Sequence, residues 1–185
     1  TIAGADSGHE SFRHHVWLET DRDRVGVPDG CLQAETAIDA YKQFARSATM
    51  LFLRQDGELI AAPEQSLEAG VSAGIVTQDD LELHLSSLFP FVRLRNYLEV
   101  RYFDAVDWRL ARSALALLSG LVYCSYATKR AEKLSECLVP GDRAGWYDLH
   151  ESAARDGLEA KALDGVSFRE LARGLLKCSQ ASRKT

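Results

Sequence analysis

Charged and apolar side chains alternate along the segment from residue 92 to residue 103. If this segment is one β-strand, its period of two places the apolar side chains on one face and the charged ones on the other. The charged face then carries Arg93, Arg95, Glu99 and Arg101. Arginine suits two-pronged contacts with phosphate or carboxylate, and a carboxylate among arginines can hold Mg²⁺ against a phosphate. The pattern therefore indicates a strand that binds an anion.

The spacing of Glu99 and Arg101 permits a shared ligand. Two residues apart on a strand, their Cα atoms are about 6.5–7 Å apart on one face. A carboxylate-bound metal and a guanidinium can then approach one polyphosphate from two sides, as phosphoryl transfer requires. An alternative stays open, because an ordinary half-buried antiparallel strand also alternates. Its charged face would simply be solvated, with Glu99 as a salt-bridge partner.

Helical and strand-like segments around this strand predict an α+β fold. Helices are expected over residues 11–20, 35–48, 77–88, 108–126, 128–138, 142–163 and 167–180, and shorter strands over residues 49–54 and 59–62. An Asp-Gly pair between the two shorter strands indicates a hairpin turn. Residues 22–30 are expected to form a loop, and the segment 108–126 is apolar enough for a central core helix. We expect part of an antiparallel sheet, backed by helices and followed by a helical C-terminal region.

These elements predict one domain made of two portions. Residues 1–104 are the expected sheet-bearing catalytic portion with its helices, and residues 105–181 the helical C-terminal portion. The polar tail, residues 182–185, is expected to be disordered.

Bulk composition disfavours several function classes. The formal net charge of −5 argues against a general nucleic-acid binder. No apolar run approaches the ~18 residues of a membrane-spanning helix. The four cysteines form no Cys-x-x-Cys pair, and their wide spacing suits free thiols in a reducing compartment. We therefore expect a cytoplasmic protein that binds neither nucleic acid nor a membrane.

Other catalytic motifs are missing or weak in this sequence. It has no P-loop and no Gly-x-Ser-x-Gly elbow, and the His-Glu pair at 150–151 lacks the second histidine of a zinc protease helix. His9, His14 and His15 are close in sequence, but adjacent histidines point in different directions on a helix, which disfavours a chelate. His84 is expected to be structural or to lie near the entrance of the site.

Two longer blocks carry a resemblance to a known family. Residues 97–101, Tyr-Leu-Glu-Val-Arg, resemble the catalytic strand of the glutamine synthetase-like ligases, in which the glutamate binds a metal and the arginine a phosphate. The wider block 84–101 is similar to plant-type and bacterial glutamate–cysteine ligases and to the related ligase of ergothioneine biosynthesis. Residues 11–24 resemble the same family's Ser-x-Arg-x-x-x-Trp-x-x-Thr-Asp-x-x-Arg segment.

The resemblance implies an activity. The full enzyme would use ATP and magnesium (Mg²⁺) to activate the γ-carboxylate of glutamate as an acyl phosphate. The amine of cysteine, or a related amine, would then attack to give γ-glutamylcysteine. Glu99 would hold Mg²⁺ and Arg101 would contact the transferring phosphate, so both would be catalytic. Arg93 and Arg95 would make further anion contacts.

The resemblance also assigns Arg13 and Trp17 to the glutamate pocket. Arg13 would bind a substrate carboxylate and Trp17 would line the pocket, and their four-residue spacing places them on one face of the expected helix. Taken alone, Arg13 is more typical of a surface arginine, and Trp17 of a core aromatic, than of a binding pocket.

The same resemblance implies that this chain is the C-terminal part of a ligase. The family's other acidic metal ligands and much of its nucleotide site lie in an N-terminal region with no counterpart here, so a missing N-terminal segment or chain is an expected partner. Tyr102 stands where a glycine often follows the Glu-x-Arg strand. The alternative, from another class, is a catalytically inactive binding or interaction module that keeps the strand but lacks the metal cluster.

Overall fold

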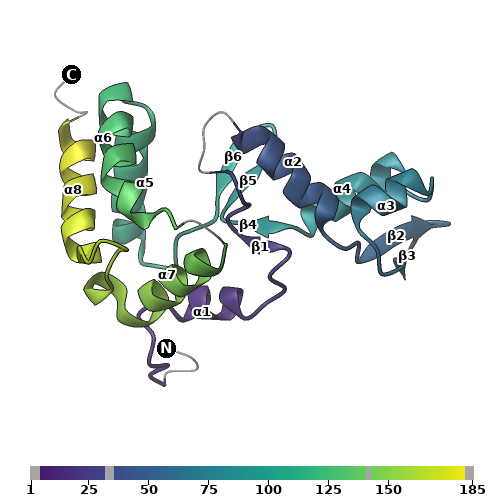
Figure 1. Ribbon diagram of the computed structural model, residues 1–185, viewed down its shortest axis with the longest axis horizontal. Helices are drawn as coiled ribbons and strands as arrows, with labels where there is room; N and C mark the ends of the chain where they lie inside the picture. Colours follow the sequence, from purple (N-terminus) through teal and green to yellow (C-terminus); the bar gives the residue numbers. More distant parts are fainter. Residues whose placement is uncertain (1–4, 32–35, 141–142, 182–185) are drawn as a thin grey trace. The chain divides into compact units, whose positions relative to one another are not determined.

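The computed structural model describes residues 5–31, 36–140 and 143–181 (Figure 1). The chain divides into two compact units, the hairpin unit of residues 17–102 and the helical unit of residues 1–16 with 103–185. The tail at 182–185, predicted to be disordered, lies outside the described residues. The division into portions at residue 104 stays a prediction.

The described residues of the hairpin unit form three helices and three pairs of short strands. They are β1 (Val25–Gly26), α2 (Ala37–Ser47), β2 (Phe52–Gln55), β3 (Glu58–Ala61), α3 (Leu67–Ser72), α4 (Gln78–Ser86), β4 (Phe89–Pro90), β5 (Val92–Leu94) and β6 (Leu98–Val100). The pairs β2–β3 and β5–β6 are antiparallel, whereas β1 pairs with β4 in parallel. The α+β class is confirmed, and the glutamine synthetase-like fold stays a prediction. The loop predicted at 22–30 is wrong where it contains β1.

The predicted turn between the two shorter strands is confirmed. Asp56 and Gly57 both have positive φ, 52° and 86°. A two-residue turn with both central residues left-handed matches the twist of an antiparallel pair, which explains the Asp-Gly sequence.

The single strand predicted over residues 92–103 is wrong. The chain bends at residues 95–97 and folds back, so that β5 and β6 form a hairpin. In a straight strand, Arg93 and Glu99 would lie about 20 Å apart. In the hairpin they are directly opposite each other, and a cross-strand pair of opposite charges favours this register. Residues 92–101 are called the arginine hairpin below.

Helix α4 begins at a capping box, as the sequence predicts. The Thr77 hydroxyl accepts from the Asp80 backbone N–H, and the Asp80 carboxylate accepts from the Thr77 backbone N–H. The same carboxylate also accepts from the Arg54 backbone N–H of β2 at 2.6 Å. Asp80 is 2% exposed, so a helix cap also joins α4 to the β2–β3 hairpin inside the unit.

Buried apolar side chains of the hairpin unit form two small clusters. One consists of Phe44, Ala45, Ala48 and Leu88, and the other of Met50, Leu53 and Leu67. Clusters of this size bury limited apolar area, so polar contacts carry much of the order in this unit.

The helical unit consists of α5 (Trp108–Val122), α6 (Ser125–Ser135), α7 (Arg143–Asp156) and α8 (Phe168–Ala181), with short 3₁₀ turns at Glu136–Leu138 and Gly157–Glu159 and the first part of α1 (Phe12–Leu18). Helices α5, α6 and α8 pack side by side (Figure 1). A Cβ at Gly120 would lie 2.8 Å from the Ser179 carbonyl oxygen, so α5 and α8 approach closely at a glycine.

The central core helix predicted at 108–126 is wrong. The α5 helix ends at Val122, α6 starts at Ser125, and no residue of α5 is buried. The apolar run therefore covers a bend between two helices. The predicted capping box of α8 is confirmed, because Ser167 and Glu170 exchange hydrogen bonds.

Within the described part of the chain, no single helix is long and apolar enough to cross a membrane. The α5 helix and Ser125–Leu138 pass by length and composition only as a pair, which is bent by 99°. All four cysteines are free thiols, as the sequence predicts.

Replacing Asp80 by alanine should destabilise the hairpin unit by about 2–3 kcal/mol, because buried donors lose a charged acceptor. Burial alone would raise the pKa of Asp80, but the hydrogen bonds from Thr77 and Arg54 outweigh it and lower the pKa. The contribution is therefore present at neutral pH and lost as pH falls through that lowered value. Urea unfolding at several pH values measures it. Asp79→Ala, exposed on the same turn, is the matched control, and an equal loss there would contradict the assignment.

Candidate anion-binding site

Three guanidinium groups converge on one carboxylate in the arginine hairpin. Arg93 donates to both oxygens of Glu99, from Nε to Oε2 at 2.8 Å and from Nη2 to Oε1 at 3.0 Å. The Nε atoms of Arg95 and Arg101 lie 3.9 and 3.8 Å from Glu99 oxygens. Three arginines against one glutamate leave a formal charge of +2. The charged face therefore keeps an excess of positive charge that favours anions.

The hairpin register positions these side chains. Arg93 faces Glu99 across the strand pair, and its Nη1 also donates to the Ser86 carbonyl at the C-terminal end of α4, at 3.4 Å. Arg101 follows β6, and its backbone N–H donates to the Phe91 carbonyl at 2.9 Å. The side chains of Arg93 and Arg101 are 13% and 18% exposed, so both reach the surface only in part.

The arginines also set the charge of Glu99. The hydrogen bond from Arg93 is the main reason that the pKa of Glu99 lies below its ordinary value, and the nearby charges of Arg93, Arg101 and Arg95 lower it further. Glu99 is therefore ionised at neutral pH, and only part of the arginine charge remains for a ligand.

Aromatic rings flank the Arg101 guanidinium. Its Cζ atom lies 5.4 Å from the ring centroid of Trp17 and 5.0 Å from that of Phe89. The Trp17 ring stacks on Phe91, with centroids 6.1 Å apart. Contacts of this kind stabilise a cation that is partly removed from water, and they hold its planar group in one orientation.

A cavity of about 290 Å³ opens beside this guanidinium. Its lining comes from the end of α1, the following segment, β1, β4 and the end of the arginine hairpin. The lining residues are Trp17, Thr20, Asp21, Arg24, Val25, Phe89 and Arg101. A small cavity with aromatic walls and a cationic group suits a small molecule that carries a negative charge.

The structure brings together most of the residues predicted from the sequence. Arg93, Arg95 and Arg101 surround Glu99, and Arg101 extends the cluster to Trp17. The remaining predicted site residue, Arg13, lies on α1 in the helical unit. Its role in a shared pocket stays a prediction.

Sequence reasoning missed Phe89 and assigned no role to Thr20, Asp21 or Arg24. Phe89 reaches the cavity through the parallel pairing of β1 with β4, and two-residue strands give no periodic signal. Asp21 and Arg24 belong to the conspicuous Thr-Asp-x-x-Arg run, and their opposite charges three residues apart were the available signal.

The described residues do not by themselves fit a magnesium centre. Magnesium usually takes one or two carboxylates together with waters and substrate phosphates. Glu99 is the one carboxylate of the cluster, and Arg93 occupies both of its oxygens. No group of three or more His, Cys, Asp or Glu side chains among the described residues is arranged to hold a metal. As described, the hairpin fits an anion and lacks the further carboxylates of a magnesium centre.

Histidines cluster around α1 in the helical unit. His14 Nδ1 lies 2.8 Å from the Ser11 hydroxyl, which donates to Asp104 at 3.0 Å. His150 on α7 is 8% exposed and stacks on Trp146, with centroids 5.3 Å apart. Burial lowers the pKa of His150 to about 4, with a smaller contribution from His14.

Comparison with known proteins places the chain in a family. A family model described as glutamate-cysteine ligase family 2 (GCS2) matches residues 1–184. The chain belongs to this glutamate–cysteine ligase family. Among its curated relatives, the chloroplastic glutamate–cysteine ligases of Brassica juncea and Arabidopsis thaliana are each 27% identical over 184 residues. These matches cover 96% of the chain, but 35% of the Brassica and 34% of the Arabidopsis protein.

A third relative repeats this pattern. The chloroplastic glutamate–cysteine ligase of Medicago truncatula is 30% identical over 134 residues, which is 69% of the chain and 26% of that protein. The family resemblance seen in the sequence is therefore confirmed. The chain spans about a third of the length of the glutamate–cysteine ligases from Brassica and Arabidopsis.

Replacing Arg93 by glutamine in this member of the glutamate–cysteine ligase family should raise the pKa of Glu99. The replacement removes the main hydrogen-bond donor to Glu99 and one positive charge beside it. A carboxyl ¹³C NMR titration of the Glu99 side chain measures the change. The same replacement at Arg54, an exposed arginine of β2, should leave the Glu99 titration where it is. An unmoved or lowered pKa in Arg93→Gln would show that the pairing is not formed in solution.

Stability of the helical unit should fall as pH drops below the ordinary histidine pKa of 6.5. His150 stays neutral in the folded chain down to about pH 4, whereas the unfolded chain binds the proton earlier. Between pH 7.5 and pH 5 this costs about 2 kcal/mol. Urea unfolding followed by the fluorescence of Trp146, in a chain whose Trp17 and Trp108 are replaced by phenylalanine, measures the slope, and His150→Phe should reduce it. The same slope in His150→Phe would place its origin elsewhere.

Proposed function

We propose that this chain is the C-terminal part of an ATP-dependent glutamate–cysteine ligase. The reaction transfers the γ-phosphoryl group of ATP to the γ-carboxylate of glutamate, which leaves ADP and γ-glutamyl phosphate. The amine of cysteine or a related amine then attacks the acyl carbon and releases inorganic phosphate. The product with cysteine is γ-glutamylcysteine. Family membership over residues 1–184 supports this class of reaction.

The observation that carries the proposal is the position of Arg101. Its side chain belongs both to the charged cluster around Glu99 and to the lining of the cavity. Phosphoryl transfer depends mainly on positioning and on neutralising the charge of the transferring group. A guanidinium that contacts the rings of both Trp17 and Phe89 supplies both.

The other residues follow from this assignment. Arg101 contacts the transferring phosphate, and Arg93 and Arg95 make further anion contacts next to it. Trp17 forms an apolar wall against the aliphatic part of glutamate, and Arg13 binds a glutamate carboxylate. Each of these roles rests on the family's sequence pattern together with the charge and cavity described above.

Glu99 has two proposed states. In the chain as described it fixes Arg93, which orders the hairpin. In a complete ligase Glu99 would hold Mg²⁺, which would require Arg93 to release one oxygen and further carboxylates to join it. Magnesium, when bound, would neutralise phosphate charge.

One observation favours the alternative, an inactive binding or interaction module. Arg93 occupies both oxygens of Glu99, and no group of three or more His, Cys, Asp or Glu side chains among the described residues is arranged to hold a metal. A module of this kind would keep the arginine hairpin and its anion affinity without catalysing the reaction.

Arg101→Ala and Glu99→Gln should each lower kcat/KM by about 10²–10³-fold, as expected when a preorganised charged group is removed. The assay follows phosphate release from ATP that requires both glutamate and cysteine. It is made on the full chain, with and without any N-terminal partner segment. Arg54→Ala, a surface arginine outside the site, should retain wild-type rates.

The outcomes separate the two proposals. Phosphate release that persists undiminished in both site variants would remove the assignment of Glu99 and Arg101. If the chain binds MgATP neither alone nor with its partner segment, the ligase proposal fails for this chain and the interaction module is supported.

A further inference from the structure

Arg24 is a buried arginine without an assigned role in the reaction. The residue is 3% exposed, although arginine is rarely buried unless its charge and donors are satisfied. We propose that Arg24 is a positioning residue. It holds the segment after α1 and strand β4, which both line the cavity, in fixed relative positions, and so fixes Trp17 and Arg101 for the anionic substrate. The inference deepens the proposed function and rests on it only for the identity of the substrate.

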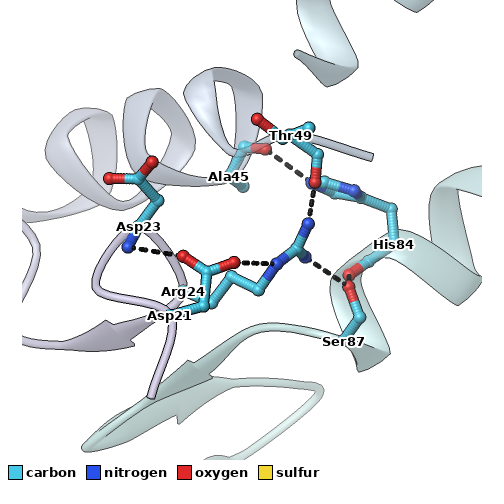
Figure 2. Close-up of polar contacts among 7 residues, drawn as sticks. All are labelled: Asp21, Asp23, Arg24, Ala45, Thr49, His84 and Ser87. Carbon is cyan, nitrogen blue, oxygen red and sulfur yellow. Dashed lines mark hydrogen bonds and ion pairs between the residues drawn. The ribbon is translucent and has the colours of Figure 1, made fainter. Parts of the chain in front are cut away.

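The Arg24 guanidinium joins three separate segments of the hairpin unit (Figure 2). Its Nε donates to Asp21 Oδ2 and its Nη1 to the Ser87 hydroxyl, both at 2.9 Å. Its Nη2 donates to the carbonyl of Thr49, just before β2. One planar group therefore connects the segment after α1, the C-terminal end of α4 and the entry to the β2–β3 hairpin.

The backbone of Arg24 carries this order to the cavity. Its carbonyl accepts from the Phe89 backbone N–H at 2.7 Å, which starts the β1–β4 pairing. One residue further, the Gly26 carbonyl accepts from the Phe91 backbone N–H at 3.0 Å. The Phe91 carbonyl in turn accepts from the backbone N–H of Arg101. The short paired strands β1 and β4, with these backbone hydrogen bonds, thus connect the Arg24 segment to the proposed catalytic arginine.

The same contacts position the part of the cavity lining that follows Trp17. Asp21 lines the cavity, and its second carboxylate oxygen accepts from the Asp23 backbone N–H at 3.0 Å. Arg24 therefore fixes a tight turn whose first residue lies four positions after Trp17. The rings of Trp17 and Phe89 meet edge to face, with centroids 6.5 Å apart, and both contact Arg101, so the positions of both rings decide where its guanidinium points.

His84 is neutral in this network, so Arg24 carries the positive charge. Its Nε2 lies 2.9 Å from the Ala45 carbonyl, and its own carbonyl accepts from the Ser87 hydroxyl at 2.7 Å (Figure 2). Burial, together with the charge of Arg24, lowers the pKa of His84. A neutral imidazole next to the guanidinium avoids like-charge repulsion, and the Ser87 hydroxyl links the guanidinium to the backbone carbonyl of His84.

Lysine cannot replace this arginine. Its ammonium is a compact point charge, whereas the Arg24 contacts point in three directions within one plane. Arg24→Lys therefore keeps the charge and loses the fork, which makes it the informative variant.

The experiment reads cavity geometry through Trp17 without substrate. Trp108 and Trp146 are replaced by phenylalanine in the full chain, which leaves Trp17 as the sole tryptophan. Arg24→Lys should raise the acrylamide quenching constant of Trp17 about twofold under native conditions, because the wall opens locally. It should also lower kcat/KM by about 10–100-fold in the phosphate-release assay. Arg46→Lys, at an exposed arginine of α2, is the matched control.

A purely stabilising role would give a different result. The melting temperature would fall in Arg24→Lys while Trp17 quenching and kcat/KM stayed at control values, and this overturns the inference. If Arg24→Lys does not fold, Ser87→Ala decides, because it removes one contact of the fork. Quenching above the Ser86→Ala control supports the inference, and quenching equal to it refutes the inference. If Arg24→Lys raises the quenching of Trp17 as expected but the chain shows no ligase activity, the proposed function is overturned and the inference about Arg24 stands.

Discussion

A buried guanidinium organises the hairpin unit. The apolar clusters of this unit are small, and its strands pair only two at a time. Arg24 compensates by joining three segments that no continuous sheet connects. A buried charge with all partners in place need not add stability compared with an apolar residue, but it penalises every arrangement in which a partner is missing. Its main effect here is to select one geometry.

Arginine serves two purposes in this unit. Arg24 is enclosed and directs its donors to the protein itself. Arg93 and Arg101 lie nearer the surface and share the charge of Glu99, which leaves the hairpin face positive overall. Glu99 holds the arginines near one another as well as partly neutralising them. Without it, the like charges at this distance would repel one another and the side chains would move apart. The family's Glu-x-Arg strand is thus compatible with an ordered resting state before any ligand arrives.

Local signals in the sequence were sufficient for local structure. The Asp56-Gly57 turn, the capping boxes at Thr77 and Ser167 and the position of most helices follow from side-chain chemistry within a few residues. The bend at 95–97 was missed because alternation is the same in one long strand and in a hairpin folded on itself. The break at Tyr123 was missed because an apolar run does not distinguish one core helix from two bent ones. For the candidate site, the sequence pointed to the four charged residues of the arginine hairpin and to Trp17, and it assigned no role to Asp21 or Arg24. It could not find Phe89 or the fork of Arg24, whose contacts join positions up to 63 residues apart.

The two-stranded form of the arginine hairpin has a consequence for assembly. Each strand of such a pair is an edge, with every second backbone N–H and C=O directed outward. An edge of this kind is a template on which an incoming extended segment can continue the ladder. On β5 the outward backbone N–H of Leu94 already donates to the Tyr41 hydroxyl at 3.2 Å, so the edge available for strand addition is β6. Addition there would widen the surface while leaving the register of Arg93 and Glu99 unchanged. The hairpin can therefore act as a preformed nucleus, around which a broader sheet grows without moving its charged face.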